Sequence, residues 1–233
     1  RAGPRPSARL QIEHVSSAQE ADMADFGAIA QGVIDGDQKR VARLVQDALA
    51  QGAPPLKLLH DGLQAAMVEI GVRFKKGDCF VPEVLLAARA MHAGLDILRP
   101  GLAKTGVPNI GKVVIGTVAG DMHDIGKNLV GMMLEGVGFQ VVDLGTNVST
   151  RKFLSAVEEH QPDLVALSAL ITTTMPAMKD TVIALGESGL RPKVKVVVGG
   201  APVTREYARS IGADAYGADA GEAAEVCRQL LPR

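Results

Sequence analysis

Residues 112–136 read KVVIGTVAGDMHDIGKNLVGMMLEG and combine three patterns in succession. The opening KVVIGTV is mostly apolar and β-branched, which favours a buried β-strand. The polar, glycine-containing segment GDMHDIG follows, and beyond it apolar residues recur at the spacing of a helix face. A strand, a loop and a helix in this order form the first half of a βαβ unit, which predicts an α/β fold.

The same alternation continues to the end of the chain. Further apolar runs of strand length are QVVDLG (140–145), DLVALSAL (163–170), KVKVVVGG (193–200) and ADAYG (213–217). Helix-like segments separate these runs, so we expect a flavodoxin-like (Rossmann-like) five-stranded parallel sheet with helices on both faces. Ligands of such sheets bind beyond the carboxyl ends of the strands, where the strand order switches.

The first half of the chain has a helical period throughout. Four segments carry apolar residues at helical spacing: 24–36, 37–52, 55–77 and 80–102. Asp37 is a plausible N-cap, Gly52 a stop, and Pro82 opens the last segment. Short connections between four helices predict an antiparallel bundle. We therefore expect three parts: a flexible tail over 1–22, a helical bundle over 23–105 and an α/β domain over 106–233.

Bulk properties narrow the class of protein. Apolar residues make up 47% of the chain, enough for a globular core, yet they form no unbroken run of about 18 residues that would predict a membrane span. The formal charge of −1 argues against a nucleic-acid partner. Cys79 and Cys227 lie far apart and the N-terminus lacks the apolar core of a signal peptide, so we expect reduced thiols and a cytoplasmic protein.

Asp121 and His123 lie one residue apart, just beyond the first predicted strand. A neutral imidazole is a good ligand for cobalt or another borderline metal, and a carboxylate that accepts its other N–H fixes the tautomer. Gly126 permits a close approach to the backbone. A solvated His–Asp pair in a loop is the alternative, and these residues alone leave it open.

The loop and three further segments resemble parts of one known family. DMHDIG has the form DxHxxG and resembles the signature of the cobalamin-binding module of methionine synthase and of the corrinoid proteins of methyltransferase systems. VALSALITTTM (165–175) resembles that family's SxL region, and VVVGGAPVT (196–204) resembles its GG region. MVEIGVRFKKGDCFVPEVLLAARAM (67–91) resembles the helical cap that precedes the module in methyl-transferring members.

The resemblance implies roles for the residues around the metal. His123 would replace the dimethylbenzimidazole base as the lower ligand of cobalt, and Asp121 would hydrogen-bond its ring. Thr174 stands where methionine synthase has a serine that completes this relay. Gly126 belongs to the same signature.

The resemblance also implies where the rest of the cofactor lies. Ser168, Leu170 and Thr172 would line the pocket of the displaced nucleotide tail, and Gly199 and Gly200 would leave room for it. A simple turn is the alternative for the two glycines. Phe80 and Leu86 of the cap would lie over the corrin face, with ordinary bundle packing as the alternative.

The function that the resemblance implies is methyl transfer through cobalamin, alternating between methylcobalamin and cob(I)alamin. A substrate-specific corrinoid methyltransferase would load the methyl group, and a second methyltransferase would pass it to a thiol or folate-type acceptor. A reductive activase would be a third partner. The sequence indicates no catalytic residue of its own, so we expect a component of an enzyme system. A cobalamin-dependent sensor, or less favourably the B12-binding subunit of a mutase, is the alternative.

Overall fold

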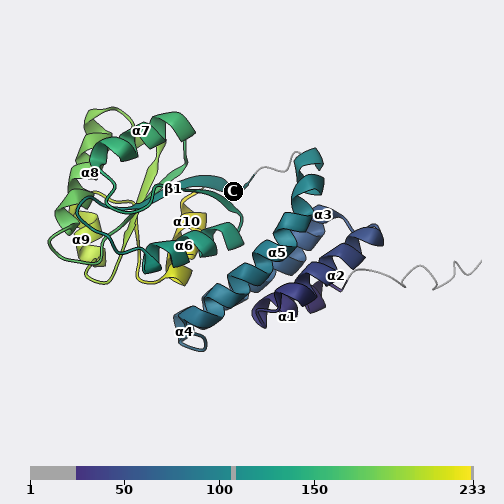
Figure 1. Cartoon of the computed structure of the whole chain (residues 1–233). Coiled ribbons are helices and arrows are strands. Elements are labelled where there is room, and N and C mark those ends of the chain that lie inside the picture. Colours follow the sequence, from purple (N-terminus) through teal and green to yellow (C-terminus); the bar gives the residue numbers. More distant parts are fainter. Residues whose placement is uncertain (1–24, 106–108, 232–233) are drawn as a thin grey trace, which may run out of the picture.

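The structure, a computed structural model, describes residues 25–105 and 109–231. A helical part comes first in the chain and an α/β part follows it (Figure 1). The predicted tail over 1–22 lies outside the described residues, as do residues 106–108 at the predicted boundary between the two parts.

The helical part contains, in chain order, α1 (Phe26–Ile34), α2 (Gln38–Ala50), α3 (Pro55–Lys57), the π-helix η2 (Leu58–Gln64), α4 (Ala65–Lys76) and α5 (Val81–Thr105). Because α3, η2 and α4 follow one another without a break, they form the third of the four predicted helices. Asp25 and Asp37 cap α1 and α2 by accepting the backbone N–H groups of Ala28 and Arg40. The prediction of a helical bundle is confirmed.

The α/β part contains β1 (Gly111–Thr117), α6 (Ile125–Gly136), β2 (Phe139–Asp143), α7 (Thr150–His160), β3 (Leu164–Ser168), α8 (Met175–Glu187), η3 (Arg191–Lys193), β4 (Lys195–Gly199), α9 (Arg205–Ser210), β5 (Ala215–Gly217) and α10 (Ala220–Leu230). The five strands are parallel, in the order β2-β1-β3-β4-β5. The chain therefore leaves β1 toward one edge of the sheet and returns to pair β3 on its other side. The predicted flavodoxin-like sheet is confirmed, with its switch point between β1 and β3.

Alternate side chains of the strands enter two different cores. Val114 and Val196 pack on one face of the sheet with residues of α7, α8 and α9. Val113 and Val197 pack on the other face with α6 and α10, and this core continues without interruption into the helical bundle. The bundle is thus seated on the α6/α10 face of the sheet (Figure 1).

Glycines bring the backbones of the two parts close together. A Cβ atom added at Gly221 of α10 would lie 2.7 Å from the carbonyl oxygen of Gly71 of α4, and one at Gly136 of α6 would lie 2.8 Å from Met67. Two polar contacts cross the same boundary: Lys75 Nζ forms an ion pair with Glu225 at 3.2 Å, and His92 Nε2 lies 3.0 Å from a carboxylate oxygen of Glu135.

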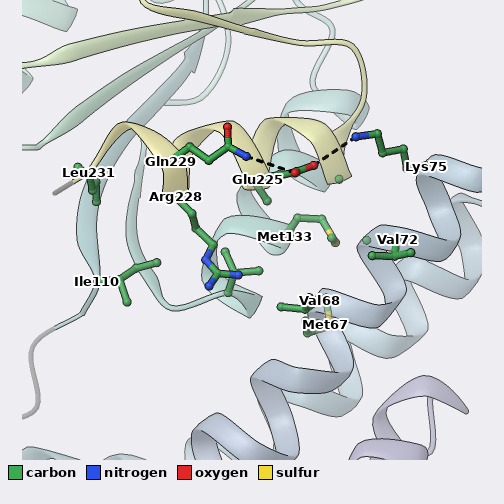
Figure 2. A pocket seen from close by; sticks show the side chains of 14 residues that line it. Met67, Val68, Val72, Lys75, Ile110, Met133, Glu225, Arg228, Gln229 and Leu231 are labelled. Atoms are coloured by element: carbon green, nitrogen blue, oxygen red, sulfur yellow. Dashed lines mark hydrogen bonds and ion pairs between the residues drawn. The ribbon is translucent and has the colours of Figure 1, made fainter. Parts of the chain in front are cut away.

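Beside the α4–α10 crossing is a groove of about 650 Å³. Figure 2 shows Val68 and Val72 of α4 on one side of it and Arg228 of α10 pointing into it from the other, with the Lys75–Glu225 ion pair at one end. Among the described residues, no helix has both the length and the apolar character needed to cross a bilayer.

Substitution of Gly221 by alanine tests the close crossing of α4 and α10. We expect Gly221→Ala to destabilise the protein by about 1–3 kcal/mol, because the new methyl group overlaps a backbone oxygen that cannot rotate away. Gly186→Ala is the matched control, since a Cβ atom there meets nothing within 4 Å on an exposed helix position. It should stabilise the protein slightly through helix propensity.

Thermal unfolding followed by circular dichroism gives the two shifts, and hydrogen exchange of the α4 amides reports separation at the crossing. Equal melting temperatures and equal exchange rates for Gly221→Ala and the unsubstituted protein would contradict the close contact.

Candidate functional site

The loop between β1 and α6 carries the predicted metal ligand. Gly120 turns the chain with φ at 82°, and α6 begins after Asp124. The hydroxyl of Thr117, at the end of β1, donates to the carbonyl oxygen of His123 at 2.9 Å. His123 therefore lies at the carboxyl edge of the sheet, beside the β1/β3 switch point.

Asp121 and His123 make a close side-chain pair. Asp121 Oδ1 accepts from the His123 ring at Nδ1 (2.7 Å) and from the His123 backbone N–H (3.0 Å). Because an ionised carboxylate can only accept, Nδ1 carries the ring proton, and the lone pair of the neutral ring is at Nε2. The Asp121 side chain is completely buried whereas that of His123 is 53% exposed. The pair thus presents an oriented ring nitrogen to the surface from a buried carboxylate.

The second carboxylate oxygen of Asp121 is held from the loop after β3. Oδ2 accepts from the backbone N–H of Leu170 at 2.7 Å and from the Thr174 hydroxyl at 2.8 Å. Thr174 Oγ1 also lies 2.9 Å from the carbonyl oxygen of Ile171, but a hydroxyl has one proton and the charged acceptor makes the stronger bond. The structure thus brings Asp121, His123 and Thr174 into one hydrogen-bond chain.

The donors around Asp121 decide its charge. Burial is the largest single influence and would raise the pKa of this carboxyl group. The backbone N–H groups of His123 and Leu170, together with the side chains of His123 and Thr174, outweigh burial and hold the pKa of Asp121 well below its ordinary value. Asp121 is therefore ionised at neutral pH.

A groove of about 620 Å³ opens beside His123. It descends between α6 and α10 to the sheet, over the carboxyl ends of β3, β4 and β5, and its walls are mostly apolar. The predicted site residues that line it are His123, Gly126, Ser168, Leu170, Gly199 and Gly200. Phe74 of α4 lines it as well, so the helical part contributes to its wall.

The surroundings of the three predicted glycines of the groove differ, and so does the reason why each position suits a glycine. A Cβ atom at Gly200, where φ is 126°, would fall 1.9 Å from the carbonyl oxygen of Ala169, and one at Gly199 would lie 2.9 Å from that of Gly217. Crowding between neighbouring backbones therefore requires both, whatever occupies the groove. At Gly126 a Cβ atom would meet nothing within 4 Å, so this glycine leaves open space in the groove wall.

Three predicted residues lie elsewhere. Thr172 is exposed on the loop after β3. Phe80, directly before α5, is 66% exposed, and Leu86, in the second turn of α5, is 46% exposed. Within the described part of the chain, these three are outside the set that lines the groove. Leu86 packs against the turn between α1 and α2, where its Cβ atom would lie 2.7 Å from a Cβ added at Gly36.

Sequence reasoning missed four residues that support the site: Phe74, Thr117, Lys127 and Asn147. The side chain of Lys127 is buried in the groove wall and pairs with Asp143 at the end of β2. Asn147, in the loop after β2, accepts the backbone N–H of Gly120 at 2.8 Å. Phe74 lies inside the cap-like segment, six residues before Phe80, which was the one available signal for it.

The geometry fits the expected corrinoid. A metal held in a macrocycle needs one protein ligand with free access, and the half-exposed ring of His123 offers Nε2. The bulky remainder of such a cofactor needs an apolar slot next to that ligand, and the groove supplies one with open space at Gly126.

Comparisons with known proteins agree with the site. Two models of the B12 binding domain match, one over residues 111–231 and another over residues 26–99. Trimethylamine corrinoid protein 1 of Methanosarcina acetivorans is 42% identical over 201 residues, which cover 85% of this chain and 93% of that protein. Dimethylamine corrinoid protein 3 of the same organism is 41% identical over 87% of this chain and 95% of its own length.

Solved structures give the same result. A cobalamin-binding protein from Desulfitobacterium hafniense matches with a TM-score of 0.77 and 32% identity, over 90% of this chain and 100% of that one. The methanol:cobalamin methyltransferase complex of Methanosarcina barkeri matches with a TM-score of 0.79 and 31% identity, over 91% of this chain and 82% of that one. The chain therefore belongs to the B12-binding family of corrinoid proteins, and its cofactor is cobalamin with its cobalt.

Proposed function

We propose that this chain carries a methyl group between two methyltransferases on cobalamin bound through His123. The observation that carries the proposal is the His123 ring, half exposed and fixed at Nδ1 by the buried, ionised carboxylate of Asp121. The most similar relatives named above are methylamine corrinoid proteins matched over most of their length. Such relatives favour a carrier over a cobalamin-dependent sensor or a mutase subunit.

When bound, the cofactor supplies the chemistry of accepting and releasing a methyl group. The chain's own residues hold and shield it. His123 would hold the cobalt through Nε2, in place of the benzimidazole base, and Asp121 and Thr174 would fix the orientation of the ring. Ser168, Leu170, Gly199 and Gly200, with Gly126, line the groove and would accommodate the nucleotide tail. In this assignment no residue of the chain acts as acid, base or nucleophile.

We further propose that residues 23–105 form a cap domain and residues 106–233 the cobalamin-binding domain. Phe74 of the helical part lies in the groove wall, and Phe80 is an exposed aromatic residue directly before α5. Phe80 and Leu86 would exclude water from the upper face of the corrin, which protects a reactive metal centre. The two exposed side chains are also available to a ligand, unlike their buried neighbours in the bundle.

We propose three protein partners for the methyl carrier. A substrate-specific methyltransferase would load the carrier, as the methanol:cobalamin methyltransferase complex among the similar structures suggests. A second methyltransferase would deliver the methyl group to a thiol or folate-type acceptor, and a reductive activase would restore the carrier after oxidation. The free, buried thiols of Cys79 and Cys227 support a reducing, cytoplasmic location.

Substitution of His123 tests the ligand. With the Co(II) form of the reconstituted protein and 15N-labelled histidine, electron paramagnetic resonance should show coupling to a histidine nitrogen. His123→Ala should abolish this coupling, and His60→Ala, on η2 in the bundle, should leave it intact. A spectrum that does not change in His123→Ala would remove the central assignment.

Substitution of Thr174 tests the hydrogen-bond chain. Thr174→Val keeps the branched shape but takes a donor from buried Asp121, so the apoprotein should lose about 1–3 kcal/mol of unfolding free energy. Cobalamin affinity should fall about tenfold, since support behind a ligand typically contributes that much. Chemical denaturation and absorbance titration give the two quantities. Thr174→Ser, which retains the hydroxyl, should remain close to the unsubstituted protein; if serine behaves like valine, the hydroxyl is not the operative group.

Substitution of Phe80 tests the shield. Phe80→Ala should speed the oxidation of bound cob(I)alamin by dissolved oxygen several-fold, with little change in cobalamin affinity. Stopped-flow absorbance measures the rate. Val72→Ala, which removes an exposed apolar side chain from the other groove of the molecule, is the control. Oxidation rates that are equal in all three proteins would count against a shielding cap.

A further inference from the structure

Asn147 has an unusual backbone conformation for its position. Its φ is 50°, and among the described residues only Gln161 is another non-glycine residue with a positive φ. Gln161 ends α7, where a left-handed residue is common. Asn147 lies in the loop between β2 and α7, just before the N-terminus of α7 and not after the C-terminus of a helix, so this reason does not apply to it. Asparagine tolerates this region better than most residues.

Asn147 makes two hydrogen bonds to the loop that carries His123. Asn147 Oδ1 accepts the backbone N–H of Gly120 at 2.8 Å, and the Asn147 backbone N–H donates to the carbonyl oxygen of Asp121 at 2.9 Å. Side chain and main chain of one residue thus hold consecutive residues of the ligand loop. The same loop is held at His123 by the Thr117 hydroxyl.

The segment that carries Asn147 is itself firmly attached. The N–H of Val148 donates to the carbonyl oxygen of Thr117 at 2.9 Å, and the N–H of Thr117 donates to that of Gly145 at 3.0 Å. At the start of the segment, Asp143 pairs with the buried Lys127 of α6 and accepts the N–H of Gly145 at 2.8 Å. Asn147 therefore connects the ligand loop to a fixed part of the sheet edge.

We propose that Asn147 is a positioning residue for the cobalt ligand. It fixes the backbone at Gly120 and Asp121, and so determines where the Asp121 carboxylate lies and how His123 is presented. The proposal rests on His123 being that ligand. Its physical basis is that the 2.7 Å bond from Asp121 to the ring lengthens if the Asp121 backbone moves by a few tenths of an ångström.

Three variants separate the effect of the Asn147 side chain from the effect of its left-handed backbone conformation. Asn147→Gly relieves the left-handed conformation and keeps the backbone N–H, but it removes the acceptor for Gly120. Asn147→Asp keeps an acceptor oxygen at the same place on an exposed side chain. Gln161→Gly relieves the other left-handed residue, at the end of α7, and is the control for backbone effects alone.

Each variant is measured with and without cofactor. In the apoprotein above pH 8, 15N chemical shifts of the His123 ring give the population of the Nδ1–H tautomer. With cobalamin, absorbance titration gives the Kd, and electron paramagnetic resonance of the Co(II) form gives the fraction with histidine nitrogen on cobalt. Asn147→Gly should lower the tautomer population and weaken binding about tenfold, the scale typical of support behind a metal ligand. It should nevertheless melt no earlier than the unsubstituted protein. Asn147→Asp and Gln161→Gly should bind normally.

The outcomes distinguish this inference from the function on which it rests. Normal tautomer, affinity and cobalt spectrum in Asn147→Gly would overturn the positioning role, as would equal losses in Asn147→Gly and Asn147→Asp. Absence of histidine coupling in the unsubstituted protein would instead overturn the assignment of His123, and the positioning role with it.

Discussion

The site depends on one ionised carboxylate, that of Asp121, whose side chain is completely buried. Asp121 keeps that charge because donors from two loops converge on its two oxygens, those of His123 on one and those of Leu170 and Thr174 on the other. A buried charge without such partners would cost several kcal/mol and would be protonated instead. The loops after β1 and β3 therefore constrain each other through one side chain. The orientation of the His123 ring follows from that mutual constraint, and the proposed binding of cobalt depends on this orientation.

Sequence patterns predicted the fold well because they are local. Alternating strand and helix periods specify a parallel sheet, and apolar residues at helical spacing specify the four-helix bundle before it. The pair Asp121 and His123 was predictable because both residues belong to one short motif. Long-range contacts could not be predicted in this way. Asn147 and Thr117 act through bonds to a loop that the sequence does not link to them, and Phe74 reaches the groove only because the bundle is seated on α6 and α10.

The predicted contacts of the cap illustrate the same limit. Phe80 and Leu86 were assigned from a motif, and the structure places both on the exposed surface rather than in the groove wall. Met122 and Ile125, on either side of His123 and Asp124 in the sequence, are also large apolar residues with most of their surface exposed, at 67% and 75%. Uncovered apolar side chains around a binding site gain from burial against a ligand or a partner, at about 25 cal/mol for each Å² removed from water.

Helix α6 connects the loop that carries His123 with the helical bundle. Its first residue follows the ligand loop directly, and its last turn carries Glu135 and Gly136, which contact the bundle through His92 and Met67. With twelve residues and a rise of 1.5 Å per residue, this helix is about 18 Å long. A movement of the bundle relative to α6 would therefore act on one end of a rigid helix whose other end adjoins His123, the proposed cobalt ligand.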